Sequence, residues 1–65
     1  MAVHHEYQVI TVIPEDDEWE AQELVSPARD KEAAIAMRNA PISGTLPHGT
    51  SRYIEVRTHT DWERL

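Results

Sequence analysis

The sequence predicts a small α+β domain: a three-stranded, mostly antiparallel sheet with one helix packed on one face, in the order β-β-α-β. Two stretches rich in β-branched residues lie near the ends of the chain, at 5–13 and 52–58, and an Ala-rich stretch at 30–40 separates them. The chain has 65 residues, close to the smallest size that folds alone. We therefore expect a single domain over 1–65.

The first strand is predicted over His5–Ile13 (HEYQVITVI), which is rich in Tyr, Val, Ile and Thr. Both of its alternating faces are largely apolar, so we expect it to lie inside the sheet or to be covered on each side. Pro14 ends the strand, because proline has no N–H to donate to a neighbouring strand.

Residues 18–25 (EWEAQELV) are ambiguous between strand and helix. Glu, Ala, Gln and Leu favour a helix, but the apolar residues do not share one helical face. A strand places alternate residues on one side of the sheet, namely Trp19, Ala21, Glu23 and Val25. Asp16-Asp17 then becomes the turn of a hairpin with the first strand. We prefer the strand and keep the helix as the alternative.

A helix is predicted over Asp30–Ala40 (DKEAAIAMRNA), where Asp30 can cap the start and Pro41 prevents extension. Ser26-Pro27 is an alternative start about one turn earlier. The face expected to pack on the sheet consists of small or flexible residues: Ala33, Met37 and Ala40, flanked by Ala34 and Ala36. Ile35 points nearly the opposite way, so we expect it to be exposed and name it as a candidate dimer contact.

The remaining chain is predicted to be a loop over Ile42–Ser51 and a strand over Arg52–Thr58. In that strand Ile54 and Val56 face inwards. Trp62 is expected to cover an exposed edge of the core.

A chain this small needs further support, and the sequence narrows what that support is. It contains no cysteine, which excludes disulfides, Cys-based zinc sites and thiol nucleophiles. A sheet of three strands also has two free edges. Pairing of edges between two copies would stabilise the domain and cover an edge, so we expect a homodimer.

The net charge of the chain lies in one segment. The formal charge is −6, from twelve acidic and six basic residues. Six of the acids lie between positions 15 and 23 without any base, so the remaining six acids balance the six bases. We expect this segment to create a directional field. Its candidate partner-binding residues are the six acids and the tryptophan among them: Glu15, Asp16, Asp17, Glu18, Trp19, Glu20 and Glu23.

The sequence does not indicate a metal or cofactor site. The EDDE stretch lacks the alternating carboxylates, the turn glycine and the distal glutamate of a calcium loop. His4 and His59 would meet if the first and last strands are antiparallel neighbours, with Glu6 or Asp61 nearby, and such ligands suit zinc. Their spacing matches no metal signature, so we expect solvated histidines.

Catalysis and direct nucleic-acid binding are not expected. With only two glycines, Gly44 and Gly49, the chain has no glycine-rich phosphate loop, and it has no GxSxG or HExxH motif. A small metal-dependent enzyme is kept as an alternative. Direct nucleic-acid binding is not favoured, because the chain has only six basic residues and a formal net charge of −6. We interpret the alternation of bases with acids as ion pairs on a solvated face, formed by Arg52, Arg57 and Arg64.

No membrane or secretion signal is evident. The chain has no apolar run near the roughly 18 residues of a membrane-spanning helix, and its first residues, MAVHHEYQV, lack the layout of a secretory signal. We therefore expect a cytoplasmic protein without a membrane partner.

The function predicted from these features is binding to a protein with a basic surface. A row of carboxylates can occupy the positions of nucleic-acid phosphates, and Trp19 offers an aromatic anchor. The hypothesis is an inhibitor or accessory factor, such as a phage-encoded protein, that docks on a nucleic-acid-binding protein by mimicry. It is based on size and charge alone. The alternative is a structural or dimerisation module whose acidity serves only solubility.

Overall fold

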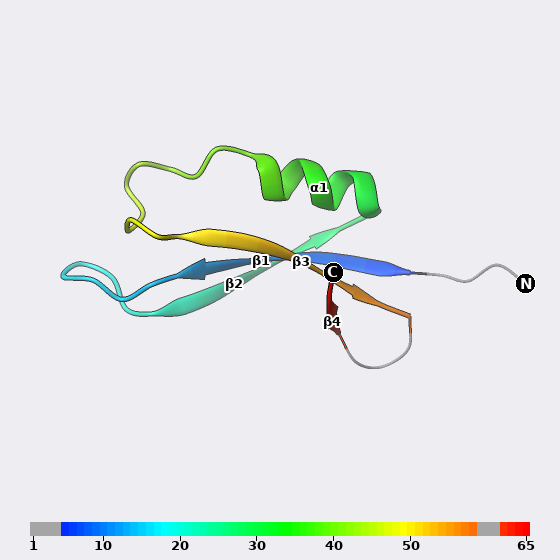
Figure 1. Cartoon of the computed structure of the whole chain (residues 1–65), viewed down its shortest axis with the longest axis horizontal. Helices are drawn as coiled ribbons and strands as arrows, with labels where there is room; N and C mark the ends of the chain where they lie inside the picture. Colours follow the sequence, from blue (N-terminus) through cyan, green and yellow to red (C-terminus); the bar gives the residue numbers. More distant parts are fainter. Residues whose placement is uncertain (1–4, 59–61) are drawn as a thin grey trace, which may run out of the picture.

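The structure is a computed structural model that describes residues 5–58 and 62–65. Its elements are β1 (Glu6–Ile13), β2 (Gln22–Ala28), α1 (Lys31–Asn39), β3 (Ser51–Arg57) and β4 (Glu63–Arg64). The strands form one sheet in the order β2-β1-β3-β4, and all neighbours are antiparallel. Helix α1 lies along one face of this sheet (Figure 1). The predicted α+β class is therefore confirmed, with four strands where we expected three.

The second element is a strand, so the preferred prediction is confirmed and the helical alternative is wrong. It begins later and ends later than expected, running from Gln22 through Pro27 to Ala28. It pairs with β1 in a register that places Val9 opposite Ser26. Pro27 fits because β2 is an edge strand, where a missing N–H costs no pairing. The alternative helix start at Ser26-Pro27 is accordingly wrong.

The fourth strand was not predicted. Glu63 and Arg64 pair with Val56 and Glu55 of β3, and the N–H of Leu65 donates to the carbonyl of Ile54 at 2.8 Å. The chain therefore turns back after β3 and adds a short strand to the open edge (Figure 1). Two paired residues are too few to give a sequence periodicity, which is why the pattern did not indicate this strand.

The core lies between α1 and the sheet. Val9 of β1, Ala34 of α1 and Ile54 of β3 are buried and form one cluster. The register explains why two of them meet, because Val9 lies directly opposite Ile54. Around this centre pack partly buried apolar side chains: Tyr7, Ala28, Ile35 and Met37.

The buried face of α1 is rotated relative to the prediction. Ala34, expected on the flank, is fully buried, whereas Ala40, expected at the centre, is exposed. The shift is about one residue, or roughly 100° around the helix. Ile35 is consequently half-buried and packs against the core cluster, so the expectation of an exposed Ile35 was wrong. Its role in a dimer stays a prediction, with less free surface to support it.

Both ends of α1 are capped by side chains. The Asp30 carboxylate accepts the N–H of Ala33 at 2.8 Å, as the sequence predicts. At the other end the Arg52 guanidinium donates from Nη1 to the carbonyls of Met37 at 3.2 Å and Ala40 at 2.6 Å. A cation at this end also complements the helix dipole.

Within residues 5–58 and 62–65, no helix is long and apolar enough to cross a membrane.

The cap at Asp30 can be tested directly. Asp30→Ala should lower the free energy of unfolding by about 1 kcal/mol, because the N–H of Ala33 loses its acceptor. Asp30→Asn should retain most of the stability, since asparagine caps nearly as well. Urea unfolding followed by circular dichroism measures both. An equal loss in the two variants would show that the carboxylate charge, and not the cap, stabilises the helix start.

Candidate functional site

The acidic residues lie in the connection between β1 and β2, and we call residues 15–20 the acidic turn. Asp16 organises it: its Oδ1 accepts the N–H groups of Glu18 and Trp19, both at 2.8 Å. Its own N–H donates to the carbonyl of Trp19 at 2.9 Å. Aspartate commonly closes a turn in this way. The turn is therefore longer than the expected Asp16-Asp17 hairpin, and Asp16 has a structural role as well as a charge.

All six acids of this segment are exposed: Glu15, Asp16, Asp17, Glu18, Glu20 and Glu23. Glu23 stands apart from the others, because it lies within β2, opposite Val12 of β1. The ion pairs found in the described part of the chain are Arg29–Asp30 and Arg57–Glu6, and neither includes an acid of this segment. The negative charge of the turn is therefore not neutralised by the cations described here.

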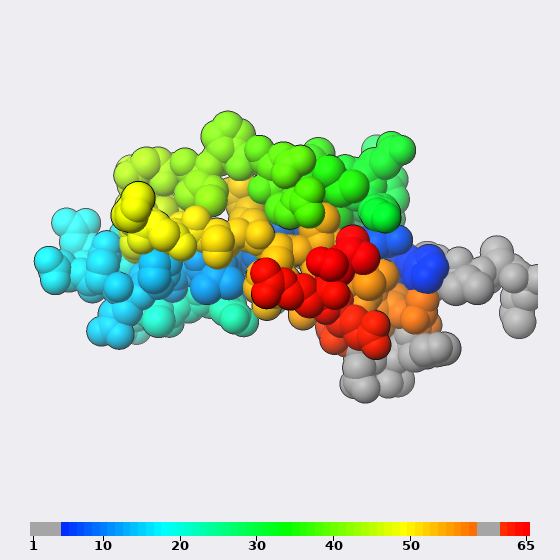
Figure 2. Space-filling view, viewed as in Figure 1, coloured from blue at the N-terminus to red at the C-terminus, as the bar shows by residue number. Residues whose placement is uncertain are grey.

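The acidic turn protrudes at one end of the molecule (Figure 2). The loop between α1 and β3 comes to the same end of the molecule (Figure 1). Gly49 of this loop, with φ +93°, lies beside Pro14: a Cβ on Gly49 would be 3.8 Å from Pro14 Cγ. The turn and the loop thus lie at a common end of the molecule, and its carboxylates come from the turn, since residues 40–50 contain no acid.

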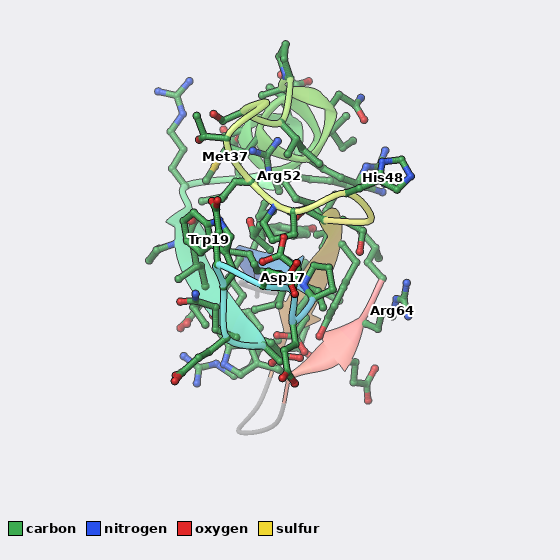
Figure 3. All side chains as sticks on the ribbon, turned by 90° about the vertical axis from the view of Figure 1, so that its left-hand side faces the viewer. Asp17, Trp19, Met37, His48, Arg52 and Arg64 are labelled. Atoms are coloured by element: carbon green, nitrogen blue, oxygen red, sulfur yellow. The ribbon has the colours of Figure 1, made fainter. Side chains whose placement is uncertain are left out.

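Trp19 is half-buried. It is not among the described side chains that pack on the cluster of Val9, Ala34 and Ile54. It belongs to the acidic turn, where its N–H donates to Asp16, and it is labelled with Asp17 in Figure 3. The tryptophan thus keeps part of its surface accessible beside the acids, although it is not fully exposed.

The arrangement of His4 and His59 cannot be placed, because both lie outside the described residues, as does Asp61, so the expectation of solvated histidines is not tested for these two. The strand neighbours on which that pair depended are confirmed, since β1 and β3 are antiparallel partners. Of the other histidines, His5 precedes β1 and His48 lies in the loop before β3, both exposed. Among residues 5–58 and 62–65, no group of three His, Cys, Asp or Glu side chains is placed to hold a metal.

The three arginines of the last strands have different environments, which corrects the interpretation of all three as ion pairs. Arg57 does pair with Glu6 and also stacks on Trp62, with its Cζ 4.6 Å from the ring centroid. Arg52 caps α1 instead. Arg64 stacks on Tyr53, with its Cζ 4.5 Å from the ring centroid, and it has no acid partner among the described residues. Alternation of charges in sequence could not distinguish these three cases.

Trp62 stacks on Arg57 of β3, but it is not among the described side chains that pack on the core cluster, so its expected cover of a core edge stays a prediction. Trp62 also lines a shallow pocket. The pocket lies at the end of the sheet where β1 begins, and Trp62, Arg57, Gln8 and Pro27 are among its lining residues. Gln8 within it donates to the carboxylate of Glu55 at 2.7 Å. Three of its polar side chains already have partners, Gln8 with Glu55 and Arg57 with Glu6, which leaves the acidic turn as the stronger candidate site.

Comparison of the chain with protein-family models, with curated proteins and with solved structures gives no match.

Proposed function

We propose that this chain is a non-catalytic protein that binds a partner with a basic surface through its acidic turn. The observation that supports this most is the concentration of six exposed carboxylates within residues 15–23, none paired with a described cation. Unpaired carboxylates at one end of a small domain form a field that attracts a cationic surface. The partner class that fits is a protein whose surface binds nucleic acid.

The geometry of the turn favours docking over solubility alone. Asp16 holds the backbone of Glu18 and Trp19 in place, so the neighbouring carboxylates project from an ordered turn. Such ordering lowers the entropic cost of presenting charges to a partner. Half-buried Trp19 adds apolar area at the same position, and aromatic residues often supply much of the binding energy at an interface. An inhibitor or accessory factor would act in this way, by occupying the sites that phosphates normally fill.

The test is capture from a cell extract on the immobilised full chain at about 50 mM and about 300 mM salt. The Debye length falls as salt rises, so a partner held by exposed charges should be retained at low salt and released at high salt. Added DNA or RNA should also release it, because nucleic acid would compete for the same basic surface. A partner that resists both treatments would contradict mimicry.

Two variants of equal net charge separate docking from general acidity. The double change Glu15→Gln with Glu18→Gln removes two charges from the turn and leaves Asp16 intact; Glu32→Gln with Glu63→Gln removes two exposed charges elsewhere. Each pair changes the formal charge from −6 to −4, since two carboxylates are lost. The first pair of changes should raise the dissociation constant for the captured partner by about 2- to 30-fold. The second pair should leave that dissociation constant unchanged. Equal effects would leave only a solubility role.

A further inference from the structure

The outer edge of β2 is a free strand edge. Among residues 5–58 and 62–65, the strand order is β2-β1-β3-β4 and β2 pairs on one side only. It is seven residues long, whereas the opposite edge strand β4 has two. Leu24 and Val25 are 46% and 58% exposed, which makes two neighbours on this strand the most exposed large apolar pair in the described chain. A strand with this composition and an unpaired backbone is a template for another strand.

Pro27 indicates which backbone groups point outwards. It lies opposite Gln8 and has no N–H, so its nitrogen faces away from β1. Backbone groups alternate in direction along a strand. The N–H and C=O groups of Val25 and Glu23 therefore also point to the free edge, while those of Leu24 point to β1.

We propose that this edge pairs antiparallel with the β2 edge of a second copy of the chain, about a two-fold axis at Leu24. Glu23 of each copy then faces Val25 of the other, and each such pair exchanges two backbone hydrogen bonds. The two Leu24 side chains meet across the axis on one face of the sheet. The two sheets become continuous, and the longest unpaired edge of each copy is covered.

The neighbouring registers are less favourable. A shift towards the start of β2 places Glu23 opposite Glu23 of the second copy, and like charges directly across a sheet are destabilising. A shift towards its end places Glu23 opposite Pro27, which cannot return a hydrogen bond. The register centred on Leu24 pairs Glu23 with Val25, which has a free N–H, and moves Pro27 opposite Ala21, which lies outside β2.

The charges flanking β2 complement each other in this arrangement. Glu18 and Glu20 precede the strand, whereas Arg29 and Lys31 follow it. The Arg29 side chain is 88% exposed, and its nearest acid is the adjacent Asp30. Antiparallel pairing brings the acidic end of each strand beside the basic end of the other, while parallel pairing would place like charges together. This pairing is independent of the proposed function.

Sedimentation of the full chain over a series of protein concentrations tests the pairing. The unmodified chain should dimerise. Leu24→Lys places two ammonium groups at the axis and should weaken the dimer at least about tenfold. Val25→Lys, of the same charge at the next position, should keep the dimer, because its ammonium faces Glu23 of the second copy. Circular dichroism checks that both variants, changed at exposed positions, are folded.

A mixing experiment tests the register itself. Leu24→Lys and Leu24→Glu should each be monomeric at concentrations where the unmodified chain is dimeric. An equimolar mixture should form a heterodimer, because opposite charges then meet at the axis. A chain that stays monomeric at every concentration, equal weakening by Leu24→Lys and Val25→Lys, or a mixture that stays monomeric would each overturn the proposal.

Discussion

Ile54→Ala should lower the free energy of unfolding by about 2–5 kcal/mol, the usual cost of emptying a buried isoleucine site. Ile54 is 1% exposed and lies in the cluster with Val9 and Ala34. A chain of this size has a total stability of about 3–10 kcal/mol, at about 0.05–0.15 kcal/mol per residue. One side chain therefore accounts for a large part of the stability. Urea unfolding at one fixed protein concentration measures the loss, because self-association would make stability concentration-dependent.

The matched control for this prediction is Ile42→Ala. Ile42 is 38% exposed in the loop after α1, so the same truncation there should cost no more than about 0.5 kcal/mol. Similar losses in the two variants would show that the cluster around Ile54 is not the main apolar core of the domain.

The strands predicted from the sequence were those with a strong local signal. A run of β-branched and aromatic residues located β1, alternation of apolar residues located β3, and an apolar pattern that fits no helix located β2. The ends of β2 were misplaced, because they depend on where a partner strand is available and not on local propensity. β4 left no signal at all, since it consists of Glu63 and Arg64 and exists only through pairing with β3.

The helix was placed correctly within one residue at each end, but its orientation was not. Helical periodicity showed which residues share a face, and three alanines in five residues made several faces nearly equivalent. The choice between them came from the sheet: Ala34 fits directly over Val9 and Ile54, and Ile35 then reaches the edge of the same cluster. Such a choice depends on the shape of the surface beneath, which the helix sequence does not contain.

For the candidate site, the sequence located the charge but not its organisation. Counting residues was enough to find the acidic segment between positions 15 and 23. The hydrogen bonds from Glu18 and Trp19 to the Asp16 carboxylate depend on backbone geometry, which composition does not show. The Arg52 cap of α1 was missed for the same reason, because it joins residues 12 and 15 positions apart.

The seating of the helix gives the second large expected effect. Ala34→Leu should lower the free energy of unfolding by about 1–3 kcal/mol, since overpacking a filled core forces side chains and backbone to move. Ala34 is 0% exposed between the helix and the sheet, so a leucine fits only if α1 shifts away from Val9 and Ile54. Chemical unfolding measures the stability, and near-ultraviolet circular dichroism of the aromatic residues reports a change in packing.

Ala36→Leu is the matched control, because Ala36 lies on the same helix and is exposed. Leucine and alanine have similar helix propensities, so this variant should be nearly neutral. Ala40→Leu adds a third comparison: the face expected from periodicity alone would bury Ala40, whereas the structure leaves it exposed. A large loss at position 40 with little loss at 34 would favour the helix orientation predicted from periodicity. We expect the opposite result, a large loss of stability at position 34 and little loss at position 40, because α1 approaches the sheet closely at Ala34.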